Sequence, residues 1–290
     1  MGTSGTFGGS KSGLVPSWVD DPPSTPVAAP GSAPAGGDGG GDGGDGGAGT
    51  DTQAPPTAYP PLRPPPAGSG LGAARGNLTR GARTSDGRAI RRGAGQYVSA
   101  SGGGRGASRR MPSSRAAAGG IAGLARNFAT QGPTEALRPF NLENLAGSPA
   151  VDVFVALTDA LCPPGGTIDE AIARDAMLET IAALAAEGVG NFDEMTQEDL
   201  QEFFIGVVSR SIEGKILNEV GTNSIRVSPD LAAVERAQRM LHDFVDGCVR
   251  DRFATSGSSL ADVSSQQIDN FVSDLYGAAF DLMQTLGEAS

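Results

Sequence analysis

The sequence predicts an all-α protein: a C-terminal helical bundle preceded by a long disordered arm rich in Gly, Pro and Arg. Two observations support this prediction. Most of the 44 Gly and 20 Pro residues lie before Met111, and the entropy lost on ordering such a segment is not offset without apolar periodicity. From Ser113 onward, apolar residues recur at helical spacing between capping signals. We therefore expect a disordered linker over residues 21–112 and a helical domain over residues 113–290.

Capping signals divide this C-terminal domain into about six helices. The first is the Ala-rich run 116–128, and the next follows Ser148-Pro149. Thr167 with Glu170 forms a capping box, acids follow Thr196, Ser228-Pro229 precedes a fifth helix, and the last starts near Ser265. The spacing places the following residues, among others, on buried faces: Val155, Ile172, Leu178, Ile181, Ala182, Ala185 and Leu286.

The charge is unevenly spread along the chain. Residues 1–115 carry 12 Lys and Arg against 7 Asp and Glu, a net charge of +5, whereas residues 116–290 carry 10 against 26, a net charge of −16. The chain as a whole is at −11. The pattern predicts a basic arm joined to an acidic body. An acidic body argues against nucleic-acid binding by the body itself and favours a basic protein partner.

The basic part of the arm, residues 71–115, interleaves arginines with Gly and Ser. Segments of this composition bind nucleic acid through phosphate contacts. The alternatives are a solvated linker, or one that lies on the acidic body or on an acidic partner. If the segment binds nucleic acid, the candidate contacts are Arg88, Arg91, Arg92, Arg109 and Arg110.

No pattern in the sequence indicates an active site, a metal site or a cofactor site. His242 is the only histidine, so no second histidine is present to build a metal site. Cys162 and Cys248 are interpreted as small buried residues rather than a disulfide framework, which fits a reducing compartment. No secretory signal or membrane-spanning run is visible. We expect a cytoplasmic protein that is not an enzyme.

Residues 1–20 form a separate segment that we interpret as a recognition and docking element. It begins with small residues around one aromatic, Phe7, and ends in an apolar cluster that contains Leu14 and Trp18. Apolar clusters in disordered arms often order on binding. Because Gly2 is small, removal of Met1 would expose its α-amine. The same opening also matches an N-myristoylation pattern, although a single acyl chain anchors only marginally.

The opening residues Met1 to Ser4, the pair Gly8-Gly9 and the run from Leu14 to Trp18 resemble the QatB family of the bacterial Qat anti-phage defence system. The Gly/Pro/Asp-rich linker, the Arg/Gly arm and the helical C-terminal half agree with that family in layout. The specific part of the resemblance covers residues 1–19. It implies a non-enzymatic component of a four-gene system. Its companions are an ATPase, an enzyme similar to the QueC 7-cyano-7-deazaguanine synthases, and a TatD-like nuclease.

The resemblance also implies a role for the N-terminal segment. A QueC-like enzyme activates a carboxylate with ATP and captures an amine, so the α-amine of Gly2 is the expected substrate for a deazaguanine-type modification. Thr3 and Ser4 would then be recognised as small polar residues, and the partner-binding set becomes Thr3, Ser4, Phe7, Leu14 and Trp18. The competing hypotheses are a nucleic-acid-binding adaptor and an unmodified scaffold, either of which would recruit the nuclease or the ATPase.

Overall fold

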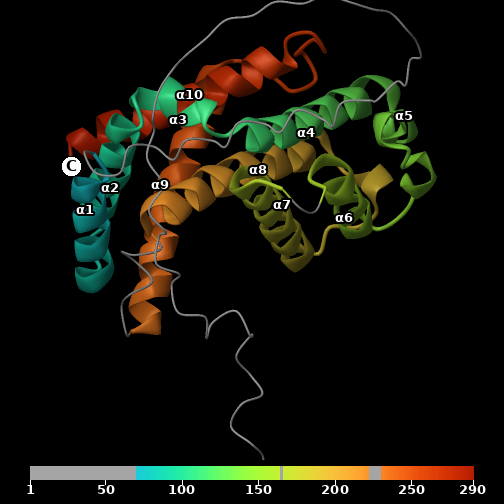
Figure 1. The fold of residues 1–290 in the computed structure, drawn as a ribbon. Helices are drawn as coiled ribbons and strands as arrows, with labels where there is room; N and C mark the ends of the chain where they lie inside the picture. Colours follow the sequence, from blue (N-terminus) through green and yellow to red (C-terminus); the bar gives the residue numbers. More distant parts are fainter. Residues whose placement is uncertain (1–69, 164–165, 222–229) are drawn as a thin grey trace, which may run out of the picture. The chain divides into compact units, whose positions relative to one another are not determined.

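The computed structural model of the chain describes residues 70–163, 166–221 and 230–290. Regular structure in these ranges is helical (Figure 1), apart from one isolated β-bridge between Pro149 and Asn191. The prediction of an all-α fold is confirmed. The α-helices are α1 (Leu71–Thr84), α2 (Gly87–Ala100), α3 (Gly103–Arg109), α4 (Pro112–Gln131), α5 (Pro133–Leu137), α6 (Ala150–Leu161), α7 (Ile168–Glu187), α8 (Gln197–Ile216), α9 (Leu231–Thr255) and α10 (Ile268–Glu288).

The capping signals place the central helices where the sequence predicts them. The Thr167 side chain accepts from the backbone N–H of Glu170, whose carboxylate accepts from the N–H of Thr167, so α7 begins with a complete capping box. Thr196 and Asp199 form the same reciprocal pair at the start of α8. Both signals satisfy backbone donors that the first helical turn leaves without partners.

Helix α8 is the centre of the domain. It packs against α4, α7 and α9 (Figure 1), and its residues Phe203 to Ser209 are all buried. Phe203 stacks on Phe154 of α6, with 3.8 Å between the ring centroids. Phe204 lies 6.0 Å from Phe253 of α9, again between centroids. Large aromatic and aliphatic side chains therefore hold this part of the fold together.

The expected linker differs from the structure over residues 71–112. These residues form α1, α2, α3 and the start of α4, and α2 and α3 both pack against α10. The domain thus begins about forty residues earlier than the predicted boundary at residue 113. Ile90, Tyr97 and Met111 are fully buried within it. Residues 1–69, which include the predicted docking segment and the Gly/Pro-rich spacer, lie outside the described residues.

The glycines that suggested a linker have a packing role in this region. A Cβ atom on Gly95 would lie 2.9 Å from the Cα of Gly287 in α10, and one on Gly104 would overlap the carbonyl oxygen of Gly277. Because glycine has no side chain, the helices can approach until their backbones touch. The Gly104 N–H donates to the Asp281 carboxylate at 2.8 Å. Glycine therefore serves here as a close-contact residue, which composition alone does not distinguish from a linker residue.

Helix α7 presents to solvent several residues that the sequence places in the core. Leu178, Ala182 and Ala185 are exposed, and Leu178 has 40% of its surface accessible. The buried face is instead Ile172, Ala173, Ala176, Met177, Thr180, Ile181 and Leu184. Ile172 and Ile181 are buried as predicted. The prediction was wrong for Leu178, Ala182 and Ala185, because α7 is apolar around most of its circumference and the sequence does not define which side packs inward. Val155 of α6 and Leu286 of α10 are also exposed.

Candidate functional site

The predicted N-terminal site lies outside the described residues. This holds for Gly2, the proposed site of modification, and for the predicted partner-binding residues Thr3, Ser4, Phe7, Leu14 and Trp18. Their roles remain predictions.

The five arginines predicted as nucleic-acid contacts separate into two groups. Arg88 and Arg109 are exposed. Arg91 and Arg92 are half-buried and donate to the Ser290 side chain and backbone carbonyl, respectively. Arg110 forms an ion pair with Glu219 at 3.2 Å. The structure therefore gives three of the five a partner within the domain and leaves two facing solvent.

Other arginines of α1 and α3 are exposed as well. Together with Arg88 and Arg109 they define what we call the basic face, whose members are Arg75, Arg80, Arg83, Arg88, Arg105 and Arg109. Asp86 is the only acidic residue between positions 71 and 115. The arginines of the basic face, each of them exposed, can consequently attract phosphate groups or an acidic protein.

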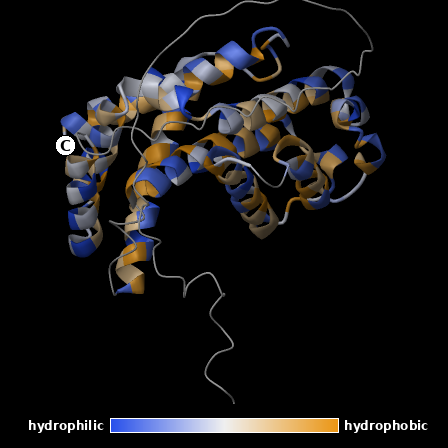
Figure 2. Cartoon of the chain, viewed as in Figure 1, coloured by the Kyte–Doolittle hydropathy of each residue, from blue (hydrophilic) through white to orange (hydrophobic). Residues whose placement is uncertain are grey.

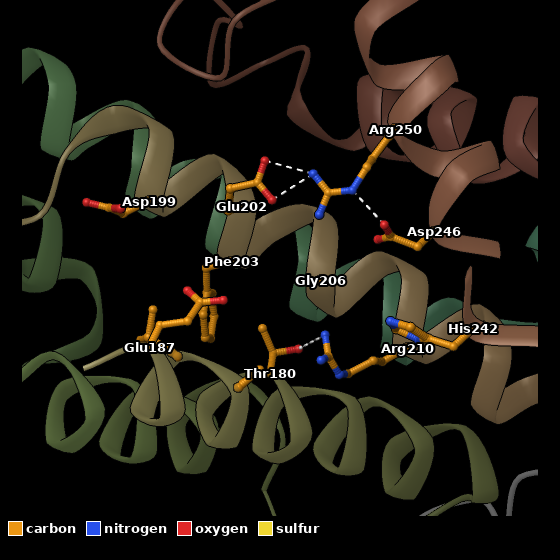
Figure 3. A pocket seen from close by; sticks show the side chains of 12 residues that line it. Thr180, Glu187, Asp199, Glu202, Phe203, Gly206, Arg210, His242, Asp246 and Arg250 are labelled. Atoms are coloured by element: carbon orange, nitrogen blue, oxygen red, sulfur yellow. Dashed lines mark hydrogen bonds and ion pairs between the residues drawn. The ribbon is translucent and has the colours of Figure 1, made fainter. Parts of the chain in front are cut away.

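A groove of opposite character runs along α8, between α7 and α9. Figure 3 shows the residues that line one part of it. The groove consists of two hollows of about 200 and 310 Å³ that share Arg210. Two arginines and one histidine line the groove beside seven carboxylates; they are Arg210, Arg250 and His242. The acidic residues are Asp175, Glu179, Glu187, Asp199, Glu202, Glu213 and Asp246.

Arg250 connects the two walls of the first hollow (Figure 3). Its guanidinium lies 2.7 Å from the Glu202 carboxylate of α8 and 2.6 Å from Asp246, one turn earlier on α9. Asp246 also accepts from the Ser209 hydroxyl at 3.0 Å. Both carboxylates near Arg250 are thus paired with it.

Two titratable groups near the junction of the two hollows, His242 and Glu179, have shifted pKa values. His242 Nδ1 lies 2.9 Å from the Glu213 carboxylate, and this hydrogen bond raises the pKa of His242 above its usual value. Burial, and then the negative charge of Glu213, raise the pKa of Glu179. Arg210 extends toward Thr180 of α7 (Figure 3), with 3.5 Å between Nη1 and Oγ1. Negative charge is therefore concentrated beyond what the local cations neutralise.

The histidine and the two cysteines of the chain lie apart from one another in chemical terms. His242 has a carboxylate partner, Glu213, at 2.9 Å. Both cysteines are free and buried, as predicted, and burial raises the pKa of Cys162 to about 11 and that of Cys248 to about 12, so neither is an activated thiolate. Across the described ranges, no group of three or more His, Cys, Asp or Glu side chains could hold a metal ion.

The sequence does not show that the groove carboxylates come together. The residues belong to three helices separated by up to 75 positions, from Asp175 to Arg250. A local signal was present only for Asp246 and Arg250, which stand four residues apart on one helix face. The convergence depends on how α7, α8 and α9 pack.

No helix in the described part of the chain combines the length and the apolar character needed to cross a bilayer. Comparison with curated proteins and with solved structures finds no match. A family model described as "Qat anti-phage system associated protein QatB" matches residues 102–283. This range lies entirely outside residues 1–19, which carry the specific part of the sequence resemblance. Because the match covers 182 of the 290 residues, the chain belongs to the QatB family, the members of which are components of an anti-phage defence system.

Proposed function

We propose that this chain is a non-enzymatic component of its defence system that binds a QueC-like enzyme and presents Gly2 as the substrate for a deazaguanine-type modification. Membership of the QatB family carries this proposal. The opening sequence supports it, because a Gly at position 2 favours removal of Met1 and leaves an amine with no side chain to hinder its approach to an electrophile. The Gly/Pro-rich composition of residues 21–69 supports a spacer between that amine and the helical domain.

The proposed reaction is an acyl transfer. The partner would activate a carboxyl group on the deazaguanine with ATP, and the neutral α-amine of Gly2 would attack the activated carbonyl carbon. A C–N bond forms, the C–O bond to the phosphate group breaks, and the amine loses a proton. An α-amine is suited to this step because its pKa, about 7.7–8.0, leaves a substantial neutral fraction near pH 7.

The test is intact-mass measurement of the chain after co-expression with the QueC-like enzyme. We expect a mass increase that tandem fragmentation assigns to Gly2. Replacing Gly2 with Pro should abolish the increase, whereas Gly5→Ala, a matched change within the same segment, should retain it. An unmodified Gly2 amine under conditions of active defence would contradict the proposal.

A second candidate function is a nucleic-acid-binding adaptor, which the basic face favours. Six exposed arginines on α1, α2 and α3 supply the charge that phosphate contacts need. This function predicts binding to duplex DNA or RNA that weakens steeply between about 50 and 200 mM salt. The double variant Arg88→Gln/Arg109→Gln should lower the affinity and flatten the salt dependence, with no change in Gly2 mass. Deleting residues 2–10 separates the two functions, because only the first requires those residues for defence.

A further inference from the structure

The outer side of α7 carries an apolar seam. Counting from Ile168, the exposed positions on this side follow a spacing of 3, 4, 3, 4 and 3 residues, which is the repeat of a coiled-coil contact seam. We call these residues the α7 seam: Ile168, Ala171, Asp175, Leu178, Ala182 and Ala185. Figure 2 shows apolar colours along most of the visible side of this helix.

The seam contains two of the large apolar side chains that the domain exposes. Ile168 has 62% of its surface accessible and Leu178 has 40%. The opposite face of α7 is already buried against α6 and α8. A helix that is apolar on both sides is normally covered on both sides, and three alanines would let a covering helix approach closely.

The unpaired charges next to the seam are acidic. The one cation beside it on α7, Arg174, is paired with Asp159 of α6 at 2.7 Å. Asp175 interrupts the seam itself, and Glu179 stands beside Leu178 on the side that faces the groove. Glu187 continues this acidic edge at the end of the helix. The raised pKa of Glu179, which burial and the neighbouring Glu213 cause, shows that negative charge is disfavoured there. A cation placed beside it would relieve that unfavourable interaction.

We infer that the α7 seam and the acidic edge of the groove form a docking site for a basic amphipathic helix of a protein partner. The partner's apolar residues would pack between the seam alanines and Leu178. An Arg or Lys of the partner would face Asp175 and thereby set the register, as single polar residues do at coiled-coil contact positions. Further basic residues would face Glu179 and Glu187.

Two other occupants have the wrong chemistry. Residues 1–69 of this chain carry two basic and six acidic residues, so charge repulsion opposes their docking along the acidic edge. In a second copy, α7 packed against α7 would bring the acidic residues Asp175, Glu179 and Glu187 of one helix toward those of the other. The basic face of a second copy has the complementary charge. However, the large apolar side chains Leu78 and Ile90 of its helices are buried and cannot pack on the seam.

The inference deepens the proposed function, which requires that the helical domain hold a protein partner, and it identifies the surface for that role. Its test does not involve Gly2 or any enzyme. A missing mass increase at Gly2 would therefore leave the docking result unchanged, and a failed docking experiment would leave the modification result unchanged.

The probe is a fluorescein-labelled synthetic 21-residue helix with Leu and Ala at the seam-facing positions, Lys at the flanking positions and one Arg placed to face Asp175. Two control peptides accompany it. One has the same composition, with its apolar residues distributed around the helix, and the other has Glu in place of every Lys and Arg. We expect saturable binding of the probe in fluorescence anisotropy and at least tenfold weaker binding of both controls.

Variants locate the bound peptide on α7. Leu178→Gln should weaken the probe about tenfold, the loss expected for half of a buried Leu side chain. Asp175→Lys should weaken it by at least as much and should restore binding of a probe whose Arg is replaced by Asp. Leu286→Gln and Asp274→Lys make the same changes at exposed positions of α10 and should have no effect. Circular dichroism verifies that each variant keeps its helical signal and unfolds in a cooperative thermal transition.

Three results would overturn the inference. The first is no binding of the probe by the intact chain. The second is equal binding of the probe and the control peptides, or equal binding by Leu178→Gln and the wild-type chain. The third is a dimer of the chain alone, seen by sedimentation, that Leu178→Gln dissociates, because the seam would then belong to a second copy.

Discussion

The carboxylate of Glu219 lies 3.2 Å from the guanidinium of Arg110 and 3.2 Å from the ammonium group of Lys215. Glu219 belongs to the π-helical turn Leu217–Gly221 at the end of α8, whereas Arg110 follows α3. One carboxylate thus joins the Arg-rich helices to the central helix. Lys215 is buried, with 8% of its surface accessible, and the Glu219 carboxylate is its counter-charge.

Replacing Glu219 with Gln should destabilise the domain by about 2 kcal/mol, because it leaves a buried Lys215 ammonium without a counter-charge. Urea unfolding measures the change. The control is Glu135→Gln, which removes an exposed pair with Arg138 and should change stability by less than about 1 kcal/mol. Equal effects of the two substitutions would show that the Glu219 pairs do not contribute more than a surface pair.

Two Gly→Ala substitutions should have opposite effects. Gly104→Ala would force α3 away from α10, at a cost of about 2–3 kcal/mol. Gly76→Ala, in the middle of α1, meets no atom within 4 Å and should stabilise the domain by about 0.5–1 kcal/mol through helix propensity. Thermal unfolding of both variants checks the pair. A neutral Gly104→Ala would contradict the close packing of α3 on α10.

The two buried tyrosines should respond differently to loss of their hydroxyl groups. The Tyr276 hydroxyl lies 2.7 Å from the Ser211 hydroxyl and donates to the Ser114 carbonyl at 3.3 Å, so Tyr276→Phe should cost about 1–2 kcal/mol. The Tyr97 hydroxyl is buried and makes no hydrogen bond of acceptable geometry with any described residue. Tyr97→Phe should therefore change the free energy of unfolding by less than about 0.5 kcal/mol. Chemical denaturation compares them directly.

Stability should fall as the pH rises through the pKa of His242 in the folded protein. The hydrogen bond with Glu213 raises that pKa above its value in the unfolded chain, so the folded state holds the proton more tightly. The contribution is fully present below the unfolded pKa, about 6.5, and is lost above the folded pKa. Unfolding free energies at pH 5.5 and 8.5 measure it, and His242→Gln should reduce the difference between them.

Glu179 contributes a fall of the same sign that begins at lower pH, because its pKa is raised from an unfolded value of about 4.3 and its charged form is disfavoured in the folded state. Glu179→Gln therefore serves as the companion variant for the pH series. If His242→Gln leaves the difference between the two pH values unchanged while Glu179→Gln removes it, the pH dependence originates in the carboxylate and not in the histidine.

Much of the fold could be predicted from local signals. The capping pairs at Thr167 and Thr196 fix where α7 and α8 begin, because they act within one helical turn. The helical structure of residues 71–112 could not be predicted, because α2 and α3 are stabilised by contact with α10, more than 150 positions away. Gly95 and Gly104 make that contact possible, and a glycine in a contact and a glycine in a linker are identical in the sequence.

For the candidate sites, too, local features could be predicted from the sequence, whereas features that depend on distant contacts could not. The arginines of residues 71–115 were correctly identified as a concentration of positive charge, but their grouping into exposed and paired residues depends on partners such as Glu219 and Ser290. The acidic groove was not predicted, because Glu179, Glu213 and His242 come from three different helices. The exposure of Leu178 was also missed, since periodicity identifies apolar positions and not the neighbour that covers them.

The contact of α2 and α3 with α10 also determines when the domain can fold. During synthesis α2 and α3 emerge first, and the glycines at their contact positions provide little apolar surface to bury without a partner. Their packing partners, Gly277, Asp281 and Gly287, belong to α10. Helices α2 and α3 can therefore reach their final positions only after α10 has left the ribosome, more than 150 positions later in the chain, so they dock late rather than as each is synthesised.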